Sequence, residues 1–377
     1  MSTHSESSRV AVIGAGIAGA ACAAGLAGAG FDVMLFDKSG RVGGRMATRL
    51  ASWVGEDGRP RSTTFDHGAQ HFNARRPRFR ALVSRAEAAG AAAAWRPRVH
   101  TPFSSEGPPD RWVPVPDMPA LCRHLLADLP LQVAPAVQRL QRDADGWRLI
   151  FADGSTTGSF GQVVMALPAA QAALLLAGHQ DTWADSLAAV PMIPCWTLMA
   201  VTEDCDWPWD AAEPERGPLA LVARNDRKPG RCAEPGLASW VAHATAAWSA
   251  AHLEEDPVAV RDALCVALAR LLPGGRATPW HYVSVHRWRY AAHAAHAALG
   301  SADFWWDAAL GLGVCGDAFG NGTVEAAWSS GDELADTVAA FSDIGLEGAA
   351  AGNEFVPTAA PRQLDPPSRA SNSEPAH

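Results

Sequence analysis

A glycine triplet between two short apolar runs constrains the fold more than any other feature of the sequence. Arg9–Ile13 (RVAVI) has the composition of a buried parallel strand, Gly14, Gly16 and Gly19 follow directly, and Asp32–Asp37 (DVMLFD) reads as the next strand. Glycines at this spacing, after a strand and at the start of a helix, are typical of a dinucleotide-binding βαβ unit. The sequence therefore predicts an α/β fold that opens with a Rossmann-like domain.

The three glycines have different structural roles, and the residues around them complete a candidate phosphate site. Gly14 permits the tight turn, Gly16 lets a pyrophosphate approach the backbone, and Gly19 lets the helix pack closely on the strand. The phosphates would sit at the positive end of the helix, at Ile17 and Ala18. The alternative interpretation of the triplet is a glycine-rich turn that packs a helix and binds no ligand.

Asp37 ends the second predicted strand, 23 residues after Gly14. An acid at this place can accept hydrogen bonds from both ribose hydroxyls of the nucleotide, and Lys38 follows it. The triplet and this acid fit NAD and FAD equally well, so they leave the choice of cofactor open.

The next segment, Asp37 to Arg49 (DKSGRVGGRMATR), resembles the second signature of the flavin-containing amine oxidase superfamily. The resemblance implies FAD: Gly43 and Gly44 would let the chain pass close to the pyrophosphate, and Arg45 would neutralise it. The alternative is a flexible glycine loop with a solvated arginine.

A third piece of the same kind lies at residues 314–331 (VCGDAFGNGTVEAAWSSG). A strand that ends in Gly316-Asp317 before a helix is where flavoproteins hold the ribityl chain, and Asp317 would accept from its hydroxyls. The N-terminus of the following helix, with Val324 and Glu325, would face the flavin pyrimidine carbonyl and stabilise negative charge there.

Composition excludes several classes of protein. The 377 residues exceed the usual size of one domain and carry a formal net charge of −9 with no basic stripe, so two lobes and no nucleic-acid partner are expected. Val10–Phe31 has no charge for 22 residues but contains six glycines, which argues against a membrane helix or a secretory signal.

The seven cysteines are scattered without a C-x-x-C pair, which favours a reducing cytoplasm over a disulfide framework or a zinc site. His293 and His296, at helical spacing but without a paired carboxylate, and His281 are not expected to hold a metal. Lys38 and Lys228 are the only lysines, and only two tyrosines are present. Mechanisms that need a lysine amine or a tyrosine pair thus have few candidates.

Beyond the first unit, the pattern predicts a helix over 81–94, a proline-rich loop over 97–119 and a disordered tail over 346–377. Antiparallel strands are expected at Cys195–Val201, Leu219–Ala223, Ala238–Thr245 and Tyr282–Trp288, and a buried strand at Leu310–Cys315. We therefore expect a discontinuous FAD-binding domain of residues 9–75, 119–170 and 305–342, with 76–118 and 171–304 as an inserted α+β substrate domain.

Four further patches resemble the bacterial renalase-like flavoproteins: FDHGAQHF (65–72), VARNDRKPGR (222–231), ASWVAHATAAWS (238–249) and HRWRYA (286–291). This resemblance implies a glutathione-reductase-type FAD domain with non-covalent FAD and a substrate domain like that of p-hydroxybenzoate hydroxylase. The family usually has Tyr where His71 stands, Trp where Ala318 stands and often Arg where Thr323 stands.

The resemblance also implies roles for individual residues. Gln70 and His71 would lie beside the flavin ring, Val137 would meet the adenine, and His243 and Trp288 would line the substrate face. Asn225 and Arg78 are candidates for holding the nicotinamide or its phosphate-bearing arm. By strand alternation alone, His243 shares a face with Val241, opposite Trp240.

The activity implied by the resemblance is the oxidation of isomeric dihydronicotinamide dinucleotides. Hydride would pass to flavin N5 and the electrons to O2, giving NAD(P)+ and H2O2. Two alternatives stay open: an amine oxidase or desaturase, for which only Lys228 could serve as the flavin-side lysine, and a flavin-binding redox sensor without turnover.

Overall fold

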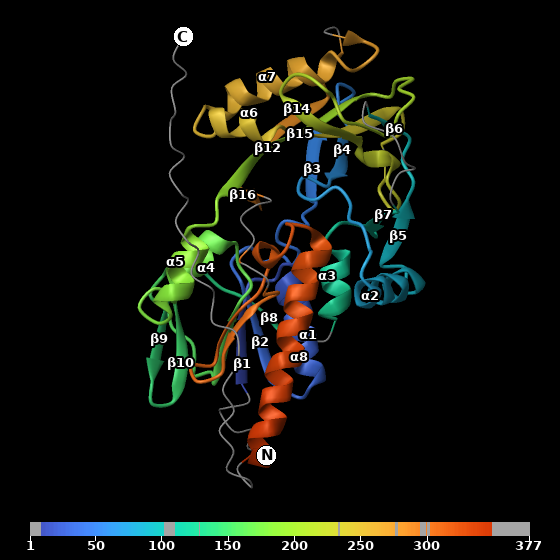
Figure 1. Cartoon of the computed structure of the whole chain (residues 1–377). Helices are drawn as coiled ribbons and strands as arrows, with labels where there is room; N and C mark the ends of the chain where they lie inside the picture. Colours follow the sequence, from blue (N-terminus) through green and yellow to red (C-terminus); the bar gives the residue numbers. More distant parts are fainter. Residues whose placement is uncertain are drawn as a thin grey trace, which may run out of the picture.

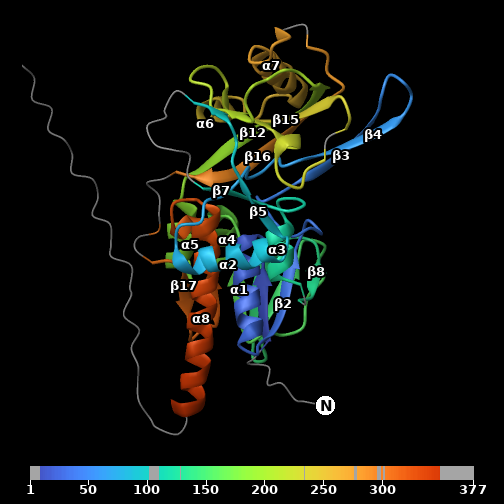
Figure 2. The same cartoon turned by 90° about the vertical axis from the view of Figure 1, so that its right-hand side faces the viewer.

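The structure, a computed structural model, has two lobes stacked end to end (Figure 1). It describes residues 9–101, 110–127, 129–232, 234–275, 278–294, 299 and 302–348. A mostly parallel sheet between helices forms the Rossmann lobe, and a mostly antiparallel sheet covered by two helices forms the second lobe above it (Figures 1 and 2). No helix in these ranges is long and apolar enough to cross a membrane.

The Rossmann lobe is built on a six-stranded sheet in the order β17-β18-β11-β1-β2-β8. Five strands are parallel, and β17 pairs antiparallel at the edge. The two strands predicted around the glycine triplet are confirmed with their exact bounds. The strands are β1 (Arg9–Ile13), β2 (Asp32–Asp37), β8 (Leu131–Val133), β11 (Gln162–Met165), β17 (Trp305–Asp307) and β18 (Leu312–Val314).

Helices cover one face of this sheet, and a mixture of helices and a hairpin covers the other. Because the central strands of a parallel sheet are buried on both faces, they form nearly continuous apolar runs, as β1 does after Arg9. The first face is covered by α1 (Ile17–Gly28), α2 (Pro77–Ala88), α3 (Ala120–Leu125) and α8 (Val324–Gly348). The second is covered by β9 (Val137–Asp143), β10 (Gly146–Phe151), α4 (Ala169–Leu176) and α5 (Asp181–Ala188).

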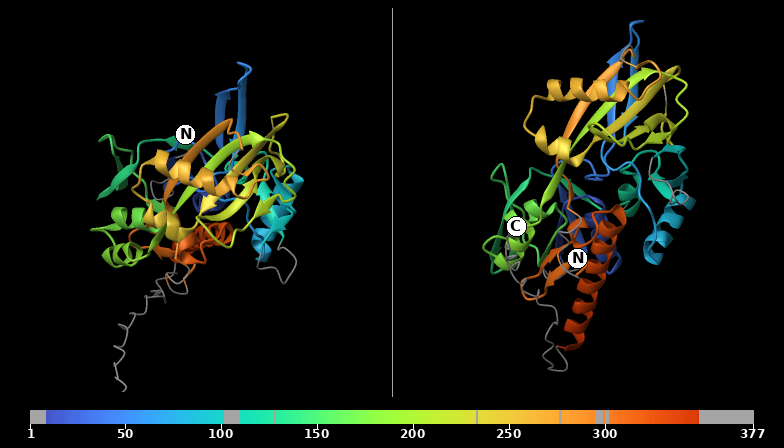
Figure 3. Two further views of the ribbon diagram at one scale, coloured as in Figure 1. Left: turned by 90° about the horizontal axis from the view of Figure 1, so that it is seen from above. Right: turned by 45° about the horizontal axis from the view of Figure 1, so that its top comes forward.

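The second lobe contains a six-stranded sheet in the order β16-β12-β15-β14-β13-β6. The four strands expected here form its antiparallel part, with the registers β16–β12, β12–β15 and β15–β14. Two helices, α6 (Ala246–Ala251) and α7 (Pro257–Ala269), lie over one face (Figure 3). The strands are β6 (Val99–His100), β12 (Met192–Glu203), β13 (Ala211–Ala212), β14 (Leu219–Arg224), β15 (Leu237–Ala244) and β16 (Tyr282–His293).

The two faces of β15 go to different neighbours, as the alternation predicts. Trp240 and Ala242 pack in the core between the sheet and α7, whereas Val241 packs on the opposite face against the hairpin of β3 (Arg49–Val54) and β4 (Pro60–Phe65). His243 therefore lies on the face that looks toward the Rossmann lobe.

The prediction of one helix over 81–94 and a loop over 97–119 is wrong in part. Helix α2 ends at Ala88 and is followed by Gly90 at φ +73°, a left-handed position that terminates helices. The alanines after it form β5 (Ala92–Trp95), which pairs antiparallel with β7 (Arg111–Pro114). Pairing with a strand distant in sequence overrides the helix preference of alanine.

The expected domain boundaries also need correction. Helix α5 and most of α4 lie in the expected substrate segment 171–304, yet both helices pack on the core of the Rossmann lobe. The β3–β4 hairpin lies in the expected FAD segment but packs on the second sheet. The expected tail over 346–377 overlaps α8, which runs to Gly348, and its remainder lies outside the described residues, as does His296.

The turn after β1 confirms the packing roles expected for two of the glycines. Gly14 has φ +107°, and a Cβ there would lie 2.4 Å from the carbonyl oxygen of Ala166. A Cβ on Gly19 would lie 1.9 Å from the carbonyl oxygen of Gly14. Both positions exclude a side chain because backbone atoms fill the space.

We expect Gly19→Ala to lower the free energy of unfolding by about 1–3 kcal/mol, because the added methyl must displace the Gly14 turn. Gly28→Ala is the matched control: it is in the same helix, and its Cβ would meet no atom within 4 Å. Denaturant unfolding measures both changes. Equal stability of the two variants would contradict the packing argument.

Candidate functional site

The N-terminus of α1 offers free space for a phosphate group. Gly16 is its N-cap and provides no side-chain cap, and the first turn holds no acidic residue. A Cβ on Gly16 would meet no protein atom within 4 Å, whereas those on Gly14 and Gly19 would collide with backbone. Ile17 and Ala18 form the first turn behind it. The helix end thus exposes its positive pole to a space that a ligand can enter.

The second glycine segment lies directly beside this turn. The Gly43 N–H donates to the carbonyl oxygen of Ala15 over 2.7 Å, and Gly43 pairs with Gly16 as an isolated parallel bridge. A Cβ on Gly44 would lie 3.3 Å from the Cα of Gly16. The two glycine segments therefore form one continuous cradle, as their order in the sequence predicts.

Asp37 is held at the end of β2 by the same turn. Its Oδ2 accepts the Ala15 N–H over 2.9 Å, and its Oδ1 accepts the Ser39 N–H over 2.8 Å. The carboxylate is half-buried next to the glycine turn, where a ribose would lie, while Lys38 is exposed.

Arg45 and Asp317 meet although they are 272 residues apart. The Arg45 guanidinium donates to both carboxylate oxygens of Asp317, over 2.8 and 2.5 Å. Gly316 precedes Asp317 and donates its N–H to Ser330 Oγ. Residues predicted to contact the pyrophosphate and the ribityl chain are therefore adjacent, in a two-bond charge pair that fixes the guanidinium plane.

Three other residues expected at the cofactor lie at the starts of two elements, β9 and α8. Val137 begins β9 and is partly buried against the core below the sheet. Val324 begins α8, and Glu325 follows it. The Glu325 carboxylate accepts the N–H groups of Arg75 and Arg76, each over 2.7 Å, so it ties the start of α2 to the start of α8.

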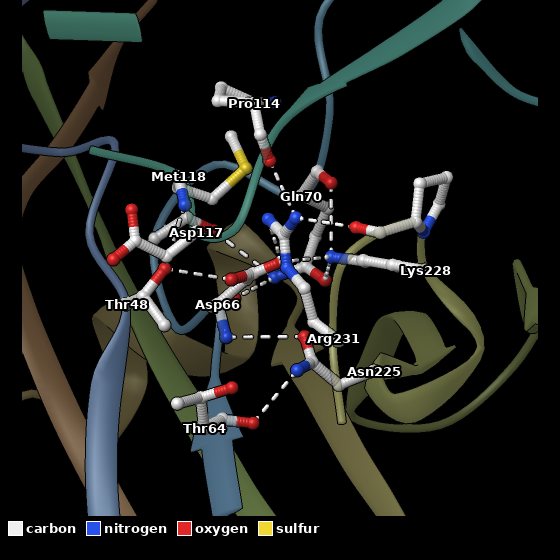
Figure 4. A network of polar contacts seen from close by, with 12 residues as sticks. Thr48, Thr64, Asp66, Gln70, Pro114, Asp117, Met118, Asn225, Lys228 and Arg231 are labelled. Atoms are coloured by element: carbon white, nitrogen blue, oxygen red, sulfur yellow. Dashed lines mark hydrogen bonds and ion pairs between the residues drawn. The ribbon is translucent and has the colours of Figure 1, made fainter. Parts of the chain in front are cut away.

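A buried ion network ties the loop after β4 to the segment after β14 (Figure 4). Oδ2 of Asp66, in the loop after β4, accepts from Lys228 Nζ over 3.1 Å and from Arg231 Nη2 over 2.9 Å. All three side chains have 0% exposure. Thr48 Oγ1 donates to the other oxygen, Oδ1, over 2.8 Å, and Arg231 Nη1 donates to the Pro114 carbonyl on β7 over 2.5 Å.

Lys228 uses all of its donors inside this network. Its ammonium contacts Asp66 Oδ2, the Gln70 carbonyl at 3.0 Å and Gln70 Oε1 at 2.8 Å. An ammonium has three N–H groups, so these three acceptors satisfy it. Burial lowers the pKa of Lys228 to about 8, against the opposing attraction of Asp66.

Gln70 links the network to His243 on β15. Its side-chain amide nitrogen donates to the backbone carbonyl of Asp66 and lies 3.3 Å from His243 Nε2. Burial, together with the positive charge of Lys228, lowers the pKa of His243 to about 4. His243 is therefore a neutral imidazole at pH 7.

A cluster of aromatic rings, formed by Trp288, His67 and His286, lies beside His243. Trp288 on β16 donates from Nε1 to the carbonyl of His67 over 2.9 Å, and the two rings stack with centroids 5.2 Å apart. His286 lies edge-on to both rings, and its Nδ1 is 2.9 Å from Nη2 of Arg49. Burial lowers the pKa of His67 to about 3 and that of His286 to about 4.

His71 lies on the other side of Gln70, where its ring packs 5.7 Å from that of Trp95. Burial and the nearby charge of Arg111 lower the pKa of His71 to about 4. Four histidines at the junction are thus held neutral, chiefly by burial and in part by cations around them.

Two of the predicted substrate residues take structural positions instead. Asn225 is fully buried; its amide donates to the Thr64 carbonyl over 2.8 Å, and its oxygen accepts the Asp66 N–H over 3.2 Å. Arg78 is 58% exposed on α2 and pairs with Asp332 and Asp336 of α8. The structure brings Gln70, His71, His243 and Trp288 together at the junction but leaves Arg78 outside it.

Sequence reasoning missed Asp66, Arg231, His67 and His286 as members of this site. The signal was present, because an acid directly after the apolar end of β4 and an Arg in the RKPGR run are charges next to buried segments. Their pairing, however, spans 165 residues and has no local trace.

Comparisons with known proteins agree with this geometry. The family model described as "NAD(P)-binding Rossmann-like domain" matches residues 12–86, and the one described as "Flavin containing amine oxidoreductase" matches residues 111–339.

Solved structures show the same fold at low identity. Cyclohexylamine oxidase from Brevibacterium oxydans has a TM-score of 0.67 at 14% identity, over 89% of this chain and 99% of that one. A cofactor-binding redesign of putrescine oxidase has a TM-score of 0.64 at 13% identity, over 88% and 99%. Reduced UDP-galactopyranose mutase has a TM-score of 0.61 at 12% identity, over 91% and 97%.

The lobe junction depends on Asp66, so we expect Asp66→Asn to lower the free energy of unfolding by about 3–5 kcal/mol. The substitution leaves Lys228 and Arg231 buried without a counter-charge. Asp32→Asn, which removes a partly exposed pair with Arg9, is the control and should change stability little. Denaturant unfolding of the FAD-loaded protein measures the free energy of unfolding of both variants. A small change for Asp66→Asn would contradict this account.

The neutral histidines predict a pH dependence of stability. Their folded pKa values, about 3 to 4, lie below the ordinary 6.5, so the unfolded chain takes up protons first as the pH falls. The free energy of unfolding should be highest above pH 6.5 and fall steadily toward pH 4. His243→Gln should reduce that slope by up to about 1.4 kcal/mol per pH unit. Identical slopes in both proteins would show that the pKa of His243 is the same in the folded and the unfolded chain, which contradicts its burial as a neutral imidazole.

Proposed function

The chain belongs to the flavin-containing amine oxidoreductase family and is an FAD-dependent oxidoreductase, and on this basis we propose that it is a renalase-like oxidase of isomeric dihydronicotinamide dinucleotides. The products would be NAD(P)+ and H2O2, with O2 as the electron acceptor. We further infer that the Rossmann lobe is of the glutathione-reductase type and that the second lobe is the substrate lobe, of the p-hydroxybenzoate-hydroxylase type.

The residues present fit FAD. The open space at Gly16 and the adjoining Gly43–Gly44 segment would hold the pyrophosphate, Asp37 the adenosine ribose, and Arg45 with Asp317 the middle of the molecule. When bound, FAD supplies the hydride acceptor of the reaction. The cradle lies at the carboxyl ends of the parallel strands, on the edge that faces the second lobe (Figure 1).

One observation carries the proposal: the histidines at the junction are held uncharged, and Lys228 is fully paired. The histidines have lowered pKa values, and Lys228 has no N–H left for a further acceptor. Such a site orients a ring and excludes water, but it does not offer a strong base. A dihydropyridine needs none, because it becomes aromatic as the hydride leaves.

Trp288 and His243 have distinct tasks in this proposal. The Trp288 ring is fixed by its bond to the His67 carbonyl and offers an apolar surface for a planar ring. His243, neutral and held by Gln70, would position the ring from the sheet side. Removal of either should therefore raise the barrier by loss of orientation rather than by loss of a proton carrier.

The amine oxidase alternative has one observation in its favour, namely a buried lysine at the lobe junction. The solved structures include oxidases named for cyclohexylamine and putrescine. Against it, the three donors of Lys228 are all engaged by protein, so none remains to hold a water. A desaturase and a redox sensor without turnover are not favoured by any such observation.

The test mixes the FAD-loaded protein anaerobically with the 2- and 6-dihydro isomers of NAD, and separately with cyclohexylamine and putrescine. We expect the flavin absorbance near 450 nm to bleach rapidly with a dihydro isomer and to return, with H2O2, when air is admitted. Bleaching by an amine alone would establish the alternative. No bleaching by any of these reductants would refute the oxidase proposal.

A further inference from the structure

Arg111 is a buried cation whose donors are largely unused. Its side chain is 10% exposed, at the start of β7, and neither Nε nor Nη1 has a hydrogen-bond partner among the described residues. Glu213, whose side chain is 38% exposed, is the nearest carboxylate, and its Oε1 lies 3.7 Å from Nη2. Buried guanidinium groups are normally satisfied on several nitrogens, so this one lacks acceptors.

His71 adds a second unpartnered group next to it. Its Nδ1 is buried and has no partner within the described part of the chain, and its ring packs on Trp95, the residue that faces Arg111 across the β5–β7 pair. Backbone bonds between Phe72 and Trp112, over 2.8 and 2.9 Å, tie the loop of His71 to the strand of Arg111. The two unpartnered groups therefore belong to one rigid unit.

The charge around this unit is positive. Lys228, over the face of Trp95, and Arg231 share the single carboxylate of Asp66, and within the described part of the chain Arg111 pairs only with the partly exposed Glu213, at 3.7 Å. Three cations thus stand against two carboxylates. An excess of buried positive charge is costly unless an anion offsets it.

We propose that Arg111 and His71 form a buried subsite that binds an oxyanion of the substrate, namely a phosphate oxygen of the dinucleotide. Guanidinium groups suit phosphate and carboxylate because both present charged oxygens in a fixed geometry. The choice of phosphate rests on the proposed function, since the dihydronicotinamide substrate carries two phosphates. A carboxylate on a different substrate has the same chemistry and is separated from phosphate by the test.

The position of the subsite, beside Gln70 and His243, suits a dinucleotide substrate. Lys228 contacts Gln70 and stands over Trp95, so it connects the ring-binding side of the junction to Arg111. A dinucleotide has a ring at one end and phosphates a few bonds away. Recognition of both would select dinucleotides over simple dihydropyridines, with Arg111 as the specificity-determining residue.

The test measures binding without turnover. Isothermal titration of the FAD-loaded protein with inorganic pyrophosphate and with benzoate compares wild type with Arg111→Gln and Arg111→Lys. Arg96→Gln is the matched control, an exposed arginine directly after β5, the strand that pairs with β7. We expect pyrophosphate to bind the wild type and the control alike, and Arg111→Gln to weaken it at least about tenfold, with Arg111→Lys between them.

Several results would overturn the proposal. These are no binding of pyrophosphate to the wild type, equal binding by Arg111→Gln, or binding of benzoate in place of pyrophosphate, which would assign the subsite to a carboxylate substrate. Retained flavin absorbance shows that a variant is folded. If Arg111→Gln does not fold, the affinity of Arg111→Lys for pyrophosphate still tests the proposal.

Steady-state kinetics then separate this subsite from the proposed function. For the dihydro dinucleotide, Arg111→Gln should raise KM at least about tenfold with a smaller effect on kcat, and for the dihydro riboside, which has no phosphate, it should change neither. If wild type is not reduced by any dihydronicotinamide, the proposed function fails, while pyrophosphate binding still reports on the subsite. Equal losses with riboside and dinucleotide would contradict phosphate recognition.

Discussion

The loop that carries Gln70 and His71 at the lobe junction is anchored by one carboxylate, that of Asp66. Asp66 lies at the end of the β3–β4 hairpin and binds Lys228 and Arg231 from the segment after β14, and Arg231 extends the connection to β7 through the Pro114 carbonyl. Because all three charged side chains have 0% exposure, a shift of the loop after β4 away from the segment after β14 would leave a buried charge unpaired. The junction therefore has one well-paired arrangement, and the loop that carries Gln70 and His71 is held in it.

The same network sets the electrostatics of the site. Burial lowers the pKa of His71 and His243; the charge of Arg111 and then that of Lys228 add to this at His71, and the charge of Lys228 adds to it at His243. Lys228, which could otherwise act as a base or hold a water, spends its donors on Asp66 and Gln70. In the proposed function, a junction of this kind would bind and orient an electron-rich ring and attract an anionic group, and it would leave the chemical step to the substrate and the cofactor.

The local parts of this structure could be predicted from the sequence, and the distant pairings could not. The glycine triplet with β1 and β2 is contiguous, so spacing alone indicated the turn that Gly14 and Gly19 make. Alternation along β15 placed His243 opposite Trp240 because a strand has a period of two. The β5–β7 pair was missed because its alanines favour a helix until a partner strand is present, and the pairing of Asp66 with Arg231 has no neighbour in sequence to reveal it.

The most direct test of this account is a crystal structure of the FAD-loaded protein. The account predicts phosphates at the N–H groups behind Gly16, and the isoalloxazine ring at the lobe junction between the loop of Gln70 and the face of His243 and Trp288. Lys228 should keep its bond to Asp66. A flavin ring placed away from this junction, or a Lys228 released from Asp66 to hold a water at the ring, would contradict it.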